Sequence, residues 1–165
     1  AQMYGVAFRY TKSAEEAQDL LQEAFLIIFD NIEQYTGKGQ LGSWMRRIVV
    51  NEALKWYKKR AKQPQMLSYD DYESTIGEEL VMDTEYDEEH TREVLLGFIR
   101  ELPQGYKMVF NLYEIEGYSY KEIAEKLNCT MTTCRSQLSK AKNILRKKIN
   151  DFNEQQKKIK THGEK

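Results

Sequence analysis

The fold of this chain is decided at residues 118–149, which read YSYKEIAEKLNCTMTTCRSQLSKAKNILRKKI. Ser119 and Glu122 have the spacing of a capping box, which satisfies free backbone N–H groups at the start of a helix. Asn128 tolerates the left-handed backbone that often follows a helix end, and Thr130 can cap a second helix. The stretch therefore predicts two helices joined by a tight turn.

The second of these helices has one apolar stripe and one polar, basic face. The stripe recurs at intervals of three and four residues, as in a half-buried helix, and consists of Met131, Cys134, Leu138, Ala141 and Leu145. The opposite face carries Thr132, Thr133, Arg135, Ser136, Ser139 and Lys140, and 128–149 contains no acidic residue. A short helix, a turn and a basic second helix form the layout of a DNA-binding helix-turn-helix. The alternative is an ordinary amphipathic hairpin, but solvated faces usually mix charges of both signs.

The composition indicates a soluble, mostly helical protein, because only two of 165 residues are Pro and nine are Gly. No apolar run approaches the roughly 20 residues that span a bilayer, and no signal peptide is apparent. We therefore expect a cytoplasmic location and no membrane insertion. The two Cys, five residues apart, fit neither a disulfide framework nor a zinc spacing. Cys134 is expected to be a small core residue.

Charge is distributed in blocks, although the net charge is only −1. Residues 37–62 contain eight basic residues against one acidic residue, and residues 128–149 contain six against none. Between these blocks, residues 63–93 contain eleven acidic residues against one basic residue. Two basic blocks separated by an acidic one predict two nucleic-acid contacts on one chain.

Helical periodicity is found in the first part of the chain. Residues 3–10 resemble the end of a helix whose beginning is missing, and Ser13 and Glu16 form another capping box. Helically spaced apolar residues follow: Ala17, Leu20, Leu21, Ala24, Phe25 and Ile28. After a glycine-containing turn, Ser43 can cap a helix that runs to about residue 60. The residues expected to face inward there are Trp44, Met45 and Ile48, whereas the outward stripe is Arg47, Asn51 and Lys55.

Periodicity is lost at residues 63–90, returns at 91–102, and continues in a helix that starts near Pro103 and ends at Gly117. We therefore predict an all-α fold of two small helical domains at 1–62 and 91–152. An acidic flexible linker at 63–90 joins them, and a polar, frayed tail follows at 153–165.

Catalytic arrangements are not found in the sequence. His90 and His162 have no Cys or carboxylate partner at a useful spacing. No phosphate-binding glycine loop is present, and the acidic run at 83–89 is of a kind that usually holds no ion. We therefore predict that the chain is not an enzyme and needs no cofactor or metal.

Three stretches together resemble the extracytoplasmic-function group of bacterial sigma factors, the sigma-70 relatives that have only regions 2 and 4. They are AEEAQDLLQEAF at 14–25, YTGKGQLGSWMRRIVVNEALKWYKKR at 35–60, and LPQGYKMVFNLYEIEGYSYKEIAEKLNCTMTTCRSQLSKAKNIL at 102–145. The resemblance covers most of the chain in the expected order. It implies a region 2 helical bundle, an interdomain linker and a region 4 helix-turn-helix.

The resemblance also implies a role for each stretch. The β′ clamp helices of core RNA polymerase would be contacted by Asp19, Gln22 and Glu23. The −10 promoter element would be opened and read by Arg47, Asn51, Lys55 and Trp56, with Trp56 the most exposed aromatic. The −35 element would be read by Thr132, Thr133, Arg135, Ser136, Ser139 and Lys140. Further expected partners are the polymerase β flap and an anti-sigma factor.

This sequence departs from the family pattern at a few positions. Cys129 stands where a Gly or another small residue is common, and Cys134 stands where Val is usual. Gln137 and Lys140 replace common Arg residues, which affects the promoter sequence read and not the class of protein. From this resemblance, we expect the start of region 2 to be truncated.

Two other functions are compatible with parts of the sequence. A helix-turn-helix regulator of another class would bind duplex DNA without docking on polymerase, but it leaves the basic block at 37–62 unexplained. A nucleic-acid-processing enzyme would need metal-binding carboxylates or a nucleophile, which the sequence lacks.

Overall fold

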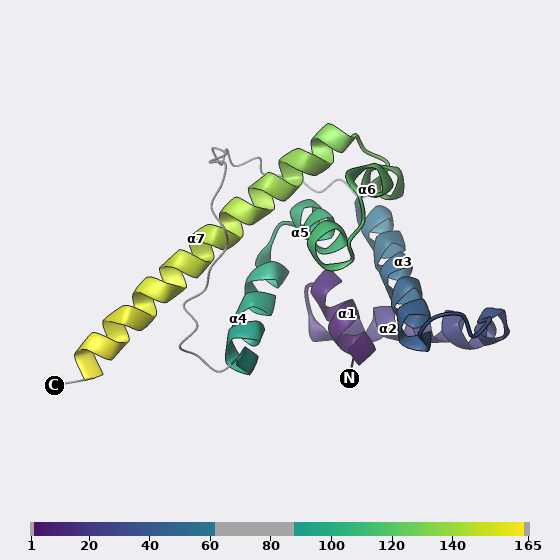
Figure 1. Cartoon of the computed structure of the whole chain (residues 1–165), viewed down its shortest axis with the longest axis horizontal. Coiled ribbons are helices and arrows are strands. Elements are labelled where there is room, and N and C mark those ends of the chain that lie inside the picture. The colour runs from purple at the N-terminus through teal and green to yellow at the C-terminus, as the bar shows by residue number, and fades with distance from the viewer. Residues whose placement is uncertain (1, 62–87, 164–165) are drawn as a thin grey trace. The chain divides into compact units, whose positions relative to one another are not determined.

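The computed structural model describes residues 2–61 and 88–163, and the account of the fold is confined to them (Figure 1). These residues form seven α-helices and two short helical segments of other types, with no strand among them. They divide into two compact units, with α1–α3 in the first and α4, α5 and α7 in the second. The predicted all-α fold is confirmed. The predicted linker lies outside the described residues, except that residues 88–90 form the first turn of α4.

The first unit is built from three helices that all pack on one another. α1 spans Gln2–Tyr10, α2 spans Ala14–Asp30 and α3 spans Leu41–Ala61, and a 3-10 turn (η1) at Ile32–Gln34 follows α2. Their buried apolar side chains form one core: Val6, Ala7, Tyr10, Ala17, Leu20, Ala24, Ile28, Val49, Val50, Ala53 and Leu54.

The start of α2 follows the predicted capping box in its first half, because Ser13 caps the helix but the Glu16 carboxylate bonds to the residue before the cap. Ser13 Oγ accepts a hydrogen bond from the Glu16 N–H at 3.2 Å, and Glu16 Oε2 accepts one from the Lys12 N–H at 2.8 Å. The predicted apolar face of α2 is the face that packs inward, since four of its six residues are buried and Leu21 and Phe25 are half-buried.

The start and the inward face of α3 differ from the prediction. The helix begins before Ser43, because the N–H groups of Ser43 and Trp44 already bond to the Gln40 carbonyl at 3.0 and 3.3 Å. Ser43 is therefore not the cap. The three residues expected to face inward are only half-buried: Trp44, Met45 and Ile48. The fully buried positions lie further along: Val49, Val50, Ala53 and Leu54.

An ion pair ties the beginning of α2 to the end of α3. Arg60 Nη1 donates to Glu16 Oε1 at 2.9 Å, and the Arg60 guanidinium also lies over the Trp56 ring at 5.0 Å. Burial acts to raise the pKa of Glu16. The hydrogen bond from the Lys12 N–H and the hydrogen bond and charge of Arg60 outweigh that effect, so the pKa is lowered.

The second unit contains α4 (Glu88–Glu101), α5 (Gln104–Phe110), a π-helical turn η2 (Asn111–Ile115) and α7 (Met131–Gly163). Residues 120–124 of α6 (Tyr120–Leu127) belong to it as well. α7 packs on α5 and α4. Ion pairs reinforce this packing, with Lys142 Nζ 2.7 Å from Glu114 Oε1 and Lys148 paired with Glu101. The buried apolar residues are Ile99, Leu102, Met108, Val109, Phe110, Leu112, Ile123, Ala124, Cys134, Leu138, Ala141, Leu145 and Ile149.

The predicted helix-turn-helix is formed by α6 and α7. Ser119 Oγ accepts from the Glu122 N–H at 3.3 Å, and Glu122 Oε2 accepts from the Ser119 N–H at 2.8 Å, so the capping box is confirmed. Pro103 precedes α5 directly, and Gly117, with φ 75°, lies between η2 and α6. Both boundaries agree with the prediction.

The turn between α6 and α7 is closed from both sides. Asn128 has the expected left-handed backbone, with φ 54°, and the Cys129 N–H reaches back to the Ala124 carbonyl at 3.0 Å. This bond is the 6→1 closure of a Schellman motif. Thr130 Oγ1 then accepts from the Thr133 N–H at 3.0 Å and caps α7 as predicted.

Two features of α7 differ from the prediction. Met131 is 46% exposed and does not belong to the apolar stripe, because it is the first residue of α7 and the buried stripe starts at Cys134. The helix continues to Gly163 rather than fraying past Phe152. The Phe152 ring packs edge-on against Phe98 of α4, with 6.1 Å between ring centroids, so packing on α4 extends beyond Ile149.

We expect the two units to have separate cores. A mutation that creates a cavity in one core tests this expectation. Leu20 is fully buried in the first unit, so Leu20→Ala should destabilise that unit by about 2–5 kcal/mol through lost burial and a residual cavity. Differential scanning calorimetry should resolve two transitions, of which only one shifts. A common shift of the whole profile would contradict separate cores.

The hydrogen bond from the Lys12 N–H to Glu16, together with the Arg60 ion pair, should make the first unit sensitive to acid. The Glu16 carboxylate has a lower pKa in the folded chain than in the unfolded chain. It stabilises the fold at any pH above its unfolded-state pKa, and this stabilisation is lost as the pH falls through its folded-state pKa. Glu16→Gln should lower stability at neutral pH by less than about 1 kcal/mol, because the Arg60 partner is partly exposed. The difference in stability between Glu16→Gln and the parent should shrink as the pH falls below 4.5, the ordinary pKa of a glutamate.

The calorimetric transition that Leu20→Ala shifts is the one to follow against pH. Glu15→Gln is the matched control, since Glu15 lies in the same first turn of α2 and is exposed. An equal pH dependence of the two variants would show that the helix terminus, and not the contacts of Glu16 with Lys12 and Arg60, causes the effect.

Candidate functional site

One side of α2 is an exposed face of mixed character. Asp19, Gln22 and Glu23 are all exposed, on the opposite side of the helix from its buried residues. Two large apolar side chains continue this face, since Leu26 is 61% and Phe29 is 70% exposed. A surface that combines carboxylates with uncovered large apolar groups is typical of a protein-binding face. Sequence reasoning missed Phe29, although its helical spacing from Gln22 and Leu26 was visible.

A hydrogen bond joins this face to α3. Trp56 Nε1 donates to Glu23 Oε2 at 2.7 Å, although the two residues were expected to serve different partners. Trp56 is half-buried, with Arg60 over its ring, so it is less exposed than predicted. The indole N–H is therefore occupied, whereas part of the ring surface is open to solvent.

The outward stripe of α3 is basic and accessible. Arg47, Asn51 and Lys55 are exposed as predicted. The Lys55 ammonium forms an ion pair with Glu52, whose carboxylate is largely buried. Lys55 therefore offsets the cost of burying that carboxylate, and part of its charge is committed within the helix.

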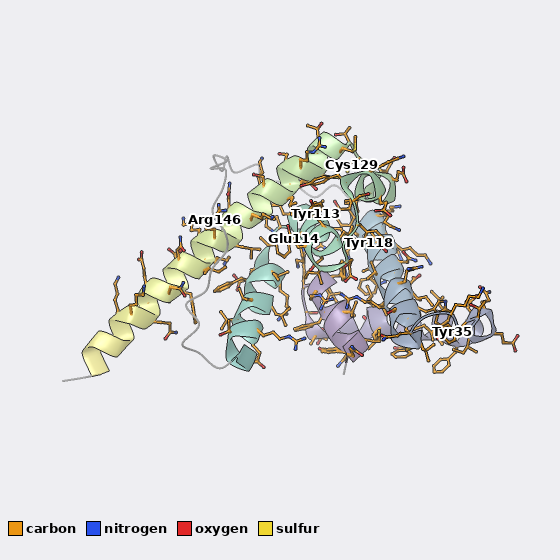
Figure 2. All side chains as sticks on the ribbon, viewed as in Figure 1. Tyr35, Tyr113, Glu114, Tyr118, Cys129 and Arg146 are labelled. Atoms are coloured by element: carbon orange, nitrogen blue, oxygen red, sulfur yellow. The ribbon has the colours of Figure 1, made fainter. Side chains whose placement is uncertain are left out.

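The loop before α3 has a backbone that depends on glycine. Gly37 and Gly39 have φ values of 73° and 86°, a region that side chains other than Gly rarely adopt. The Tyr35 hydroxyl, labelled in Figure 2, donates to the Gly39 carbonyl at 2.7 Å, and the Tyr35 ring lies 5.8 Å from that of Trp44. This loop leads directly into the basic stripe of α3.

The polar face of α7 is uneven in exposure. Thr132, Arg135 and Ser136 are exposed, while Thr133, Ser139 and Lys140 are half-buried. Thr133 is partly committed to the cap, because its N–H bonds to Thr130 Oγ1 and the two hydroxyl oxygens lie 2.9 Å apart. The fully accessible groups therefore cluster in the first turns of the helix.

Two tyrosines support Arg135. Its guanidinium carbon lies 5.2 Å from the centre of the Tyr120 ring, and Tyr120 stacks on Tyr113 at 4.5 Å (Tyr113 is labelled in Figure 2). Burial, followed by a hydrogen bond with Tyr113, raises the pKa of Tyr120, so its phenol stays neutral. The cation–π contact limits the positions that Arg135 can take. Arg135 and Tyr120 are 15 residues apart in the sequence, so no local pattern predicted this contact.

The described residues offer no metal-binding cluster and no membrane-spanning helix. Within residues 2–61 and 88–163, no group of three or more His, Cys, Asp and Glu side chains could hold a metal ion. None of the described helices is long and apolar enough to cross a membrane. The two basic stripes lie on helices of different units, α3 in one and α7 in the other.

The sequence matches two protein families in order along the chain. Residues 1–63 match the family "Sigma-70 region 2", and residues 92–145 match "Sigma-70, region 4". The basic stripe of α3 falls in the first match and the basic face of α7 falls in the second.

Curated relatives are similar over most of their length. The ECF RNA polymerase sigma-E factor of Haemophilus influenzae is 30% identical over 152 residues, which cover 88% of this chain and 80% of the relative. The RNA polymerase sigma-H factor of Pseudomonas aeruginosa is 28% identical over 152 residues, covering 88% and 79%.

A solved structure shares the fold. It is the co-crystal structure of the sigma factor RpoE in complex with the anti-sigma factor NepR from Bartonella quintana, with a TM-score of 0.53, 19% identity and 90% of each chain covered. Because both sigma-70 regions occur in order and a relative at 30% identity covers most of both chains, this chain belongs to the extracytoplasmic-function sigma factors, the RNA polymerase subunits that recognise promoters.

Proposed function

We propose that three surfaces of this sigma factor divide the work of promoter recognition. The exposed face of α2 docks on core RNA polymerase, α3 and the loop before it open and hold the −10 element, and the start of α7 reads the −35 element. The observation that carries this division is the placement of two basic stripes on helices of separate units. The polymerase performs the chemistry, so the chain itself is not an enzyme and works in the cytoplasm.

Docking on the β′ clamp helices is assigned to Asp19, Gln22 and Glu23. Their exposure on one side of α2 supports this assignment. Leu26 and Phe29 extend the same face and add apolar area, which polar residues alone would not supply. The second unit is assigned to the β flap. An anti-sigma factor is a further proposed partner, consistent with the complex named for the structural relative.

Promoter opening is assigned to α3. A base that leaves the stack costs a few kcal/mol, so the separated strand must be held by new contacts. Arg47 and Lys55 can neutralise phosphates, and Asn51 between them can contact a base edge. Because the Trp56 N–H is held by Glu23, we assign its indole to stacking rather than to hydrogen bonding with a base.

Recognition of the −35 element is assigned to the start of α7. Arg135 is the principal base-reading residue in this proposal, because it is exposed and held by Tyr120. Thr132 and Ser136 flank it on the accessible part of the face and are suited to phosphate or base-edge contacts. Thr133, Ser139 and Lys140 are more covered and are assigned to the edges of the contact.

Docking and reading should be separable by mutation. Asp19→Ala combined with Gln22→Ala should weaken core-enzyme binding by about 2 kcal/mol or more, as at an interface hot spot, and should reduce transcription from every promoter to the same extent. Circular dichroism should not change, because both residues are exposed. Arg135→Ala is the reciprocal control and should bind core enzyme like the parent.

The Arg135→Ala variant should lose about 1–3 kcal/mol of promoter binding if the contact is bidentate to a base. Comparison of promoters that differ only at the −35 element identifies a base contact, because a phosphate contact weakens all of them equally. Normal core binding by the α2 variant would refute the docking assignment. Normal promoter use by Arg135→Ala at physiological salt would refute the recognition assignment.

The ring of Tyr120 should position Arg135 for this contact. Tyr120→Leu should weaken promoter binding by the holoenzyme by about 0.5–1 kcal/mol, the usual strength of an exposed cation–π contact. Tyr120→Phe keeps the ring and should behave like the parent. In a double-mutant cycle, Tyr120→Leu should have no further effect once Arg135 is Ala. Additive losses would mean that Tyr120 acts independently of Arg135.

A further inference from the structure

The two cysteines lie on either side of the helix-turn-helix turn with their sulfur atoms in contact. Cys129 Sγ and Cys134 Sγ are 3.4 Å apart, with Cys129 half-buried and Cys134 buried. Figure 2 labels Cys129 at the junction of α6 and α7. The sequence analysis did not predict this pairing, because five residues along a regular helix do not bring two side chains together.

The contact follows from the backbone of the turn. Cys129 directly precedes the capping residue Thr130, and Cys134 is the fourth residue of α7. These are the two positions of a hydrophobic staple, whose side chains meet across the start of a helix. The Cys129 backbone is fixed as well, because its N–H bonds to the Ala124 carbonyl. Both sulfur atoms are therefore held in place by local structure.

We propose that Cys129 and Cys134 are a peroxide-sensitive dithiol, which forms an intramolecular disulfide across the turn and weakens reading of the −35 element. The sulfur atoms need only close from 3.4 Å to the bonding distance of about 2.05 Å. A metal site fits less well, because among the described residues no third His, Cys, Asp or Glu joins the pair.

The two thiols have different roles in this reaction. Burial, together with the neighbouring Cys129, raises the pKa of Cys134 to about 12, so at neutral pH it remains a thiol. Cys129 is the more exposed of the two and is therefore the residue that meets the oxidant. Cys134 then acts as the resolving thiol, which its contact with Cys129 allows.

The chemistry balances with hydrogen peroxide as the oxidant. The Cys129 thiolate attacks one peroxide oxygen, the O–O bond breaks, and the released hydroxide takes a proton to become water. The Cys134 sulfur then attacks the sulfenic sulfur of Cys129. The S–O bond breaks, and the hydroxyl group leaves as water with the proton of Cys134. Two thiols lose two electrons in total, and one peroxide becomes two waters.

Disulfide formation should act on DNA reading through the turn. The closed ring contains Thr130, which caps α7, and the first-turn residues Thr132 and Thr133. Drawing the Cys129 sulfur toward α7 pulls on a residue whose N–H also closes the end of α6. The relative placement of α6 and α7, and with it the start of the reading face, should therefore change on oxidation.

The first test measures the covalent product on the full-length chain. The reduced protein is treated with a small excess of hydrogen peroxide, alkylated under denaturing conditions and analysed by intact and peptide mass spectrometry. We expect a monomer that has lost two hydrogen atoms, has no alkylated cysteine, and regains both thiols with dithiothreitol. Both cysteines still open to alkylation, or only intermolecular products, would overturn the proposal.

Two variants test the assigned roles. Cys134→Val fills the buried site without a thiol, and its Cys129 should stop at the sulfenic acid, which dimedone traps. Cys129→Ala leaves only the buried thiol, which should react much more slowly than Cys129 does in Cys134→Val. If the parent shows as much dimedone adduct as Cys134→Val, Cys134 does not resolve the sulfenic acid and the proposal fails.

The second test measures promoter binding and rests on the proposed function of α7. Oxidised or reduced protein, freed of peroxide, is assembled with core enzyme in reductant-free buffer. Oxidation should weaken binding to a −35-dependent promoter several-fold, and reduction should reverse this effect. Core binding, and the promoter binding of Cys129→Ala, should be unaffected. An unchanged affinity of fully disulfide-bonded protein would overturn the control of DNA reading. Failure of the reduced protein to bind any promoter would instead count against the proposed function, since disulfide formation is measured independently of DNA.

Discussion

The second unit depends on the closure of a three-residue turn at residues 128–130. Asn128 adopts a left-handed backbone, the Cys129 N–H satisfies a carbonyl of α6, and Thr130 satisfies an N–H of α7. The two hydrogen bonds each pair a backbone group that a helix end leaves unsatisfied. With all of them in place, the direction of α7 relative to α6 has little freedom. The closed turn therefore fixes the positions of the exposed groups at the start of α7.

In the first unit, a chain of polar groups on the surface connects α2 to α3 outside the apolar core. Glu16 binds Arg60, Arg60 covers Trp56, and the Trp56 N–H binds Glu23. The proposed polymerase face and the proposed strand-opening helix are thus connected by side chains, and neither surface is independent of the other. A partner that displaces Glu23 from Trp56 would release the indole N–H on the side of α3. Such a contact would give the proposed docking a direct physical route to the helix proposed to open the promoter.

Local sequence signals predicted the parts of the fold that local chemistry determines. The capping residues Ser13, Ser119 and Thr130 and the left-handed Asn128 could be recognised because each interaction spans only a few residues. The inward face of α3 could not, because its apolar residues from Trp44 to Tyr57 lie on several sides of the helix. The length of α7 was underestimated, since extending a helix that has already formed costs little even where the sequence is polar.

The candidate surfaces were predicted in kind, but not in their internal contacts. The exposure of Arg47, Asn51 and Arg135 follows from helical phase and was predicted correctly. The Glu23–Trp56 bond joins residues 33 positions apart, and the Arg135–Tyr120 contact crosses a turn. Neither leaves a periodic pattern in the sequence. The π-helical turn at Asn111–Ile115 was not predicted for a similar reason, because one extra residue in a helical turn has no signature in the types of residue.

The placement of the two tryptophans has a spectroscopic consequence. The chain has only Trp44 and Trp56, and both belong to α3. Intrinsic indole emission is therefore a reporter confined to one unit, while α4–α7 contribute only tyrosine. Trp56 is the more informative of the two, because its N–H is engaged by a carboxylate and its ring is covered by a guanidinium. Its emission wavelength and quenching are coupled to α2, so events on either helix can be followed without attaching a label.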